Sequence, residues 1–263
     1  MKKFIFIVAS FFILSCERND KKAKPENTEQ VQLIDHLSKQ VKENPDSAGL
    51  RMKLVHSYDS LKMFKQAIAQ TDSLIKRDSL NNGLWYTKAQ LQEESGDTVA
   101  AIRSYEKALK IYPSVDAQLS LANLLAETKN ERALLISRNV VTMGLGRETS
   151  AAANFIAGVY FARTGDVKRA IQLFDKAIID NYTLMEAYME KGFIYYDSKN
   201  YQQALQTFET ALTVNKTYAD AYYWKAKCNE ALGNKSEALV NYKRSLGLDK
   251  QLKEAADAIK RLE

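Results

Sequence analysis

Proline and glycine are scarce in this sequence, with 3 Pro and 10 Gly among 263 residues. Average proteins carry about 5 % Pro and about 7 % Gly, so few positions here interrupt regular structure. Because proline breaks helices and glycine weakens them, this scarcity predicts a mostly helical chain. The interruptions are also regularly placed, since Gly96, Gly165 and Gly233 are separated by 69 and 68 residues, close to twice 34. The spacing indicates an internal repeat.

Cysteine and histidine are equally rare, with two of each. Cys16 and Cys228 cannot build a disulfide framework, and Cys228 lies in an amphipathic pattern that predicts a small buried side chain. His36 and His56 belong to no His-x-x-x-His or Glu-x-x-His pattern, so we expect no metal site. Because no catalytic constellation and no cofactor motif emerges either, we predict that the protein is not an enzyme.

The charge balance is mild and gives no sign of a nucleic-acid partner. The sequence has 38 Lys and Arg residues and 32 Asp and Glu residues, and charges of both signs are interspersed along the chain. No run of Lys and Arg forms a basic arm or stripe, so we expect no DNA or RNA binding.

The N-terminus has the pattern of an export signal. Lys2 and Lys3 precede an apolar run over residues 4–14, which is too short to span a bilayer as a helix, and Ser15-Cys16 follows. The end of this run, with Ile13 where leucine is more typical, resembles the lipobox of bacterial lipoproteins. That resemblance implies a signal peptide over residues 1–15 and a lipid anchor on Cys16, in the bacterial cell envelope at the outer membrane or the periplasmic face. An ordinary secretory signal with a chance cysteine is the alternative.

Residues 16–27 are polar, and we predict a flexible tether between the anchor and a folded body. The body shows six units that start at residues 48, 82, 116, 151, 185 and 219. We number the residues of each unit from its start and call these numbers places. The second unit has Trp85 at place 4, Gly96 at place 15, Ala101 at place 20, Tyr105 at place 24 and Pro113 at place 32. These residue types recur at the same places in the other units. The pattern resembles the tetratricopeptide repeat.

The spacing has a physical reason, because places 20, 24 and 27 fall on one face of an α-helix. Small residues at place 8 let two helices of a unit approach, and glycine at place 15 suits a tight turn. The resemblance implies an all-α fold, a right-handed α-solenoid of about six helix-turn-helix repeats over residues 48–252. Amphipathic segments at 28–47 and 253–263 are predicted to be N-terminal and C-terminal capping helices.

The unit that starts at residue 116 is the weakest. Its turn at Thr128-Lys129-Asn130 is two residues short, and Ser137 and Val140 replace the usual aromatic residue and alanine. The following segment, residues 143–150, contains two glycines and is predicted to be a longer loop at which the solenoid bends or shifts its stacking.

In tetratricopeptide repeat proteins the first helices of the units line the concave face, chiefly through places 2, 5, 9 and 12. Aromatic residues and methionine at such places predict a groove for a protein or peptide partner. The candidate residues are Tyr86, Phe155, Val159, Met189, Phe193, Tyr196, Tyr223 and Lys227. An alternative interpretation is that several of them pack as plain core. The carboxylate clamp of chaperone-binding relatives is missing, since Met52 and His56 occupy its first two places.

The sequence therefore favours a membrane-anchored, non-catalytic adaptor for a protein or peptide. At the level of signal and repeats it is similar to lipoproteins that assist pilus biogenesis, outer-membrane protein assembly or envelope remodelling. A self-associating structural subunit of an envelope assembly is the alternative. A receptor for a small ligand would need an enclosed pocket, which open solenoids seldom provide.

Overall fold

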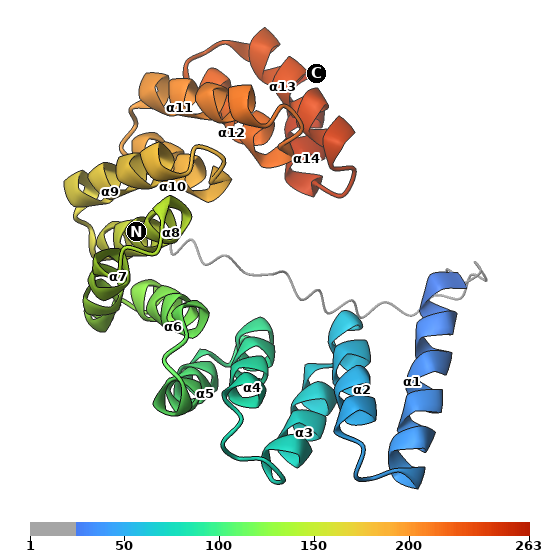
Figure 1. Ribbon diagram of the computed structural model, residues 1–263. Helices are drawn as coiled ribbons and strands as arrows, with labels where there is room; N and C mark the ends of the chain where they lie inside the picture. The colour runs from blue at the N-terminus through green and yellow to red at the C-terminus, as the bar shows by residue number, and fades with distance from the viewer. Residues whose placement is uncertain (1–24) are drawn as a thin grey trace.

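A computed structural model describes residues 25–263, and this part of the chain is an α-solenoid with no strand. Its helices form an open arc with α1 at one end and α14 at the other (Figure 1). The predicted all-α fold is thus confirmed. The predicted signal peptide, Cys16 and the tether up to residue 24 lie outside the described residues. Within residues 25–263, no helix has the length and apolar character that crossing a bilayer requires.

Six helix pairs, which we call units, follow the first helix. The helices are α1 Pro25–Glu43, α2 Ala48–Ser60, α3 Phe64–Ile75, α4 Asn82–Glu94, α5 Thr98–Ile111, α6 Val115–Glu127, α7 Arg132–Thr142, α8 Arg147–Thr164, α9 Val167–Asp180, α10 Met185–Asp197, α11 Tyr201–Val214, α12 Ala219–Ala231, α13 Lys235–Leu248 and α14 Lys253–Leu262. The first helix of each unit lies on the inner side of the arc and the second on the outer side (Figure 1).

The turn inside each unit is built at a single place with positive φ. Gly96, Gly165 and Gly233 have φ of 83°, 90° and 85°, the left-handed region that glycine enters without strain. In the other three units a lysine adopts this conformation, with φ between 56° and 60° at Lys62, Lys129 and Lys199. The turn is therefore common to all six units, although only half of them show the glycine in the sequence.

Each second helix inserts a side chain from place 24 between the helices of its own unit. The rings of Tyr105, Phe174, Phe208 and Tyr242 occupy this place and are at most 2 % exposed. Alanines on the same face are fully buried beside them. Because a single unit exposes the rest of its apolar face, neighbouring units must stack to cover it.

An ion pair recurs at the junctions between units. Lys88 Nζ lies 2.6 Å from Asp72 Oδ1, and Lys191 Nζ lies 2.5 Å from Asp175 Oδ1. Lys225 Nζ pairs in the same way with Glu209 Oε1 at 3.0 Å. Each lysine is at place 7 of a first helix and each carboxylate at place 25 of the preceding second helix. The pairs join consecutive units beside their shared apolar face.

The stacking changes between the third and fourth units, as the sequence predicts. Helix α8 packs against α6 as well as α7, whereas first helices of successive units elsewhere in residues 48–263 touch only marginally. The predicted longer loop is wrong, however. The connection spans only residues 143–146, and α8 begins at Arg147, four residues before the expected start of the unit. Gly146 adopts φ of 108° directly before this added turn of helix.

Candidate functional site: the concave groove

The predicted groove residues lie on first helices, but two of them are not accessible. Val159 and Met189 are 1 % and 5 % exposed, because each packs into the core between neighbouring helices. For these two, the structure corrects the prediction in favour of the core interpretation. The other six are half-buried side chains: Tyr86, Phe155, Phe193, Tyr196, Tyr223 and Lys227.

Four of these six gather around one side chain that the sequence analysis missed, Trp224 of α12. Its ring centroid lies 4.7 Å from that of Phe193, 5.3 Å from Tyr196 and 5.8 Å from Tyr223. Tilted and edge-to-face contacts of this kind are favourable for aromatic pairs. Tyr86 and Phe155 lie apart from this cluster and contact the buried rings of their own units. The run Tyr222-Tyr223-Trp224 is the sequence signal that could have located the cluster.

Lys227 is the cation at this aromatic cluster. Its Nζ lies 4.6 Å from the Trp224 centroid, 5.2 Å from that of Tyr196 and 5.8 Å from that of Tyr223. Such positions over ring faces attract a cation electrostatically. Burial lowers the pKa of Lys227 from its usual value, while Glu230 and Asp197 act in the opposite direction.

A cavity of about 570 Å³ opens beside the cluster, between α10, α12, α13 and α14. Its walls include Tyr196, Tyr223, Lys227, Tyr242 and the carboxylates of Glu254 and Asp257. We call this surface, together with Phe193 and Trp224, the concave groove. It combines accessible aromatic rings with charges of both signs.

Glu230 and Arg261 lie at the edge of the concave groove and hold α12 to α14. Arg261 Nη1 and Nη2 donate to the two carboxylate oxygens of Glu230 at 2.5 and 2.9 Å, and Tyr242 Oη donates to Oε2 at 3.0 Å. The hydrogen bonds from Arg261 are the main cause that lowers the pKa of Glu230 from its usual value of 4.5. This carboxylate is therefore occupied within the chain.

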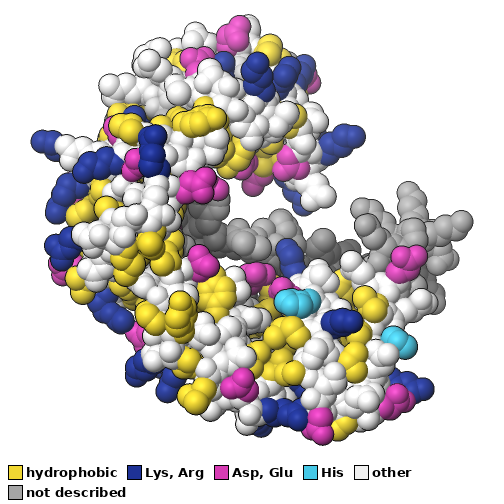
Figure 2. Space-filling model, viewed as in Figure 1, with side chains coloured by type: hydrophobic (Ala, Val, Ile, Leu, Met, Phe, Trp, Pro, Cys, Tyr) yellow, Lys and Arg dark blue, Asp and Glu magenta, His cyan; other side chains and the backbone are white. Residues whose placement is uncertain are grey.

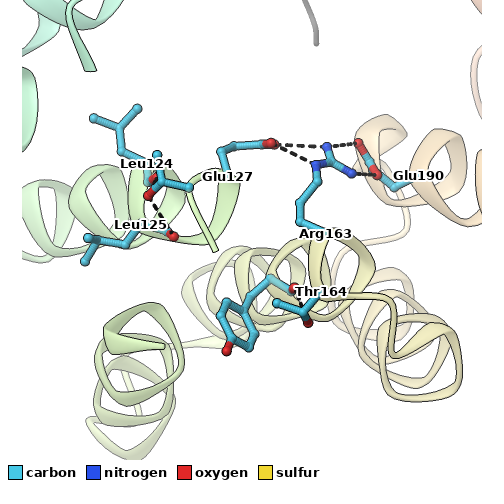
Figure 3. Close-up of polar contacts among 8 residues, drawn as sticks. Leu124, Leu125, Glu127, Arg163, Thr164 and Glu190 are labelled. Carbon is cyan, nitrogen blue, oxygen red and sulfur yellow. Dashed lines mark hydrogen bonds and ion pairs between the residues drawn. The ribbon is translucent and has the colours of Figure 1, made fainter. Parts of the chain in front are cut away.

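Farther along the inner side of the arc, Arg163 of α8 bridges α6 and α10 (Figure 3). Its Nε and Nη2 donate to Glu127 at 2.8 and 3.0 Å, and Nη1 and Nη2 donate to Glu190 at 2.9 Å each. Glu190 is only 9 % exposed. The hydrogen bonds to Glu190 are the main cause that raises the pKa of Arg163. Its guanidinium spans three first helices and is not available for a ligand.

The remaining charges near the groove are mostly acidic. Glu186, Asp197 and Asp220 are exposed on α10 and α12, and Glu254 and Asp257 are exposed on α14. Figure 2 shows acidic side chains along the inner edge of the arc. Although the whole chain carries more basic than acidic residues, this end of the inner face carries more carboxylates than cations.

Nothing in residues 25–263 resembles a metal centre. No group of three or more His, Cys, Asp or Glu side chains in this part of the chain is placed to hold an ion. His36 and His56 are exposed on α1 and α2. Cys228 is fully buried, as predicted.

Comparison with known families gives the repeat type. Sequence profiles described as tetratricopeptide repeat match residues 83–115, 138–183 and 195–262. The third and fourth helix pairs contribute to the middle match, which includes the irregular junction at residues 143–146. A search of curated proteins finds no sequence that matches this chain.

Several solved structures share the fold at low sequence identity. A tetratricopeptide repeat protein from Parabacteroides merdae is 16 % identical, with a TM-score of 0.71, over 90 % of this chain and 93 % of its own. PilW, a type IV pilus biogenesis factor, is 18 % identical, with a TM-score of 0.65, over 80 % and 96 %. Yeast Tom70 is 16 % identical, with a TM-score of 0.60, over 90 % of this chain and 58 % of its own.

Proposed function

We propose that this chain, a protein built of tetratricopeptide repeats, is a non-catalytic scaffold that binds a segment of a partner protein in its concave groove. The observation that carries the proposal is the cluster of half-buried rings around Trp224, which borders a cavity of about 570 Å³. Rigid aromatic side chains give a large contact area and are enriched in protein interfaces.

The charges at the groove favour a partner segment that is basic as well as apolar. Glu254 and Asp257 face the cavity, and Asp197 on α10 lies near Lys227 in its wall. The cations of Arg163 and Arg261 are already paired within the chain. Lys or Arg side chains of a partner would meet carboxylates here, and like-charged carboxylates would be repelled.

The binding test uses a pair of groove variants and one surface control. The full chain in its native envelope is crosslinked and purified, and each captured protein is quantified. We expect Phe193→Ala and Tyr223→Ala each to capture a specific partner at least about tenfold less than the natural chain does, because aromatic anchors dominate interface energy. Tyr112→Ala, a change at a ring that is 60 % exposed on the outer side, should leave capture unchanged. Equal capture by all three folded variants would refute the groove.

We further propose that the scaffold is a lipoprotein of a bacterial envelope, anchored through Cys16. This proposal rests on the apolar run over residues 4–14 followed by Ser15-Cys16. The fold shared with PilW, which is a type IV pilus biogenesis factor, is compatible with such a location. The test is membrane fractionation of Cys16→Ser against the natural sequence. Retention of the variant in the membrane to the same extent would contradict the anchor.

The alternative, self-association into an envelope structure, predicts a different result in solution. Sedimentation of the full chain in lipid nanodiscs distinguishes the two models. A scaffold for other proteins gives one chain per particle, whereas a structural subunit gives an oligomer whose size grows with protein concentration.

A further inference from the structure

A second hollow lies between α7, α8 and α9, outside the concave groove. Its volume is about 670 Å³, and its walls are mostly apolar, with Leu134, Leu135, Val141 and Phe161 among them. A neighbouring hollow of about 700 Å³ shares Leu134 and Phe161 with it and continues toward the start of α9. Figure 2 shows hydrophobic side chains gathered over this part of the arc. We call the two hollows together the α7 cleft.

The α7 cleft exists where the repeat lacks its usual ring. Place 24 holds an aromatic side chain in four units, but in the third unit, whose turn is shorter, Ser137 stands at the equivalent position. Ser137 is 2 % exposed, lines the cleft, and its Oγ has no hydrogen-bond partner among the described residues. By contrast, Thr71 at this place in the first unit donates to the carbonyl of Ala67 at 2.9 Å. Because the serine side chain is smaller than the rings of the other units, it leaves space beside α7 that those rings fill elsewhere.

The same junction also lacks its ion pair. In four units a carboxylate at place 25 forms an ion pair with a Lys or Arg side chain of the next unit. These carboxylates are Asp72, Glu106, Asp175 and Glu209. In the third unit, with its shorter turn, Arg138 stands at the position equivalent to place 25, and place 7 of the following unit is Ala157. Both residues line the α7 cleft. Arg138 is exposed and forms no ion pair within residues 25–263.

The rim of the α7 cleft is positively charged. Arg132, Lys168 and Arg169 join Arg138 there, against the two carboxylates of Glu131 and Asp166. Arg132 and Arg169 are paired with Glu106 and Asp166, which leaves Arg138 and Lys168 as the cations available to a partner. Leu135 and Val141 are 51 % and 37 % exposed beside them. The cleft therefore offers an apolar floor and a basic edge.

We infer that the α7 cleft binds an acidic amphipathic helix of a partner protein. Such a helix supplies the two things that the third unit lacks, an apolar side chain over Ser137 and a carboxylate for Arg138. Helix α7 has 11 residues and is about 16 Å long, so a partner helix of about three turns matches it. Amphipathic helices commonly dock by placing their apolar stripe in a groove of this kind. The inference does not depend on the concave groove.

The probe is a displayed library of 14-residue helical peptides with randomised surface positions, selected on the full chain in lipid nanodiscs. We expect enrichment of peptides with an apolar stripe at i, i+3, i+4 and i+7, flanked by Asp or Glu. Binding of the enriched peptides should fall at least tenfold on Arg138→Glu. A peptide whose carboxylates are replaced by lysine should regain binding to Arg138→Glu, because the charges are then complementary again.

Two further variants keep the test independent of folding. Ser137→Phe fills the cleft with the ring that other units carry, and Leu135→Asp places a charge on its exposed floor; both should abolish peptide binding. Lys107→Glu, at an exposed lysine of α5, is the matched control and should bind as the natural chain does. Enrichment of basic peptides, failure of any peptide to enrich, or binding that survives Arg138→Glu and Leu135→Asp would overturn the inference. So would a dimer of the chain that Leu135→Asp dissociates, since the cleft would then join two copies.

Discussion

The ring of Phe174 lies on the backbone of α8 at Gly158. A Cβ atom at residue 158 would be 2.6 Å from Cε1 and 2.8 Å from Cδ1 of that ring, closer than real contacts allow. The same relationship joins Gly192 of α10 to Phe208 of α11. Glycine at place 8 therefore serves close packing of helix and ring rather than chain flexibility.

This contact predicts that Gly158→Ala destabilises the protein although alanine favours helices. The ring of Phe174 must move within a packed core, which costs about 1–3 kcal/mol of unfolding free energy. Denaturant unfolding followed by circular dichroism measures the change. Gly247→Ala is the control, since no atom lies within 4 Å of a Cβ there, and it should stabilise α13 by about 0.5–1 kcal/mol. Equal effects of the two substitutions would contradict the packing argument.

Removal of Arg163 should weaken the middle of the solenoid. In Arg163→Met, the nearly buried carboxylate of Glu190 loses the only ion pair it has within residues 25–263, and we expect a loss of about 2 kcal/mol in unfolding free energy. Arg169→Met is the matched control, because its pair with Asp166 is an exposed i,i+3 contact that solvent screens. Chemical denaturation of both variants tests the difference, and a loss no greater than the control's would count against the bridge.

The pair of Glu230 and Arg261 should make stability depend on pH in the acid range. A carboxyl group whose pKa is lower in the folded state than in the unfolded chain stabilises the fold when ionised. That contribution is fully present above pH 4.5 and is lost as the pH falls through the lower folded pKa. The gap in unfolding free energy between the natural chain and Arg261→Gln should therefore close toward acid pH. A gap that stays constant, as expected for the exposed control Lys260→Gln, would contradict the assignment.

The thiol of Cys228 should be inert in the folded protein. Burial raises its pKa to about 12, and the side chain is fully buried. Because the thiolate is the reactive form, alkylation should run at least about a hundredfold slower than at an exposed cysteine. The measurement uses a Cys16→Ser background, with Leu135→Cys as the exposed reference. Comparable rates for the two thiols would show that α12 opens readily.

Much of the fold could be predicted because the repeat is periodic. Expected starts at residues 48, 82, 185 and 219 coincide with the observed first helices, since helix-forming sequence and turns recur there in register. The start of α8 could not be found in this way. Gly144 and Gly146 indicated a long loop, but the helix resumes directly after Gly146 and starts four residues earlier than expected.

The concave groove could be predicted less completely than the fold. Place numbers locate residues on a helix face, but the depth of Val159 and Met189 depends on how neighbouring helices stack. Arg163 bridges to Glu127, 36 positions earlier in the chain, and to Glu190, 27 positions later. Because both partners lie in other units, a pattern within one unit could not predict this bridge. The ion pairs at places 7 and 25 could have been predicted from the sequence, because a lysine and a carboxylate recur there 16 residues apart.

The bridge of Arg163 to Glu127 and Glu190 has a mechanical consequence. A solenoid changes its curvature through small rotations between units, and opening the arc pulls first helices on the inner side apart. The guanidinium clamps α6, α8 and α10 across that inner side, so widening at this point must break charged hydrogen bonds. The arc therefore has a stiff middle. A second charged bridge, from Arg261 to Glu230, holds α12 to α14, so the end that carries the aromatic cluster around Trp224 is braced as well.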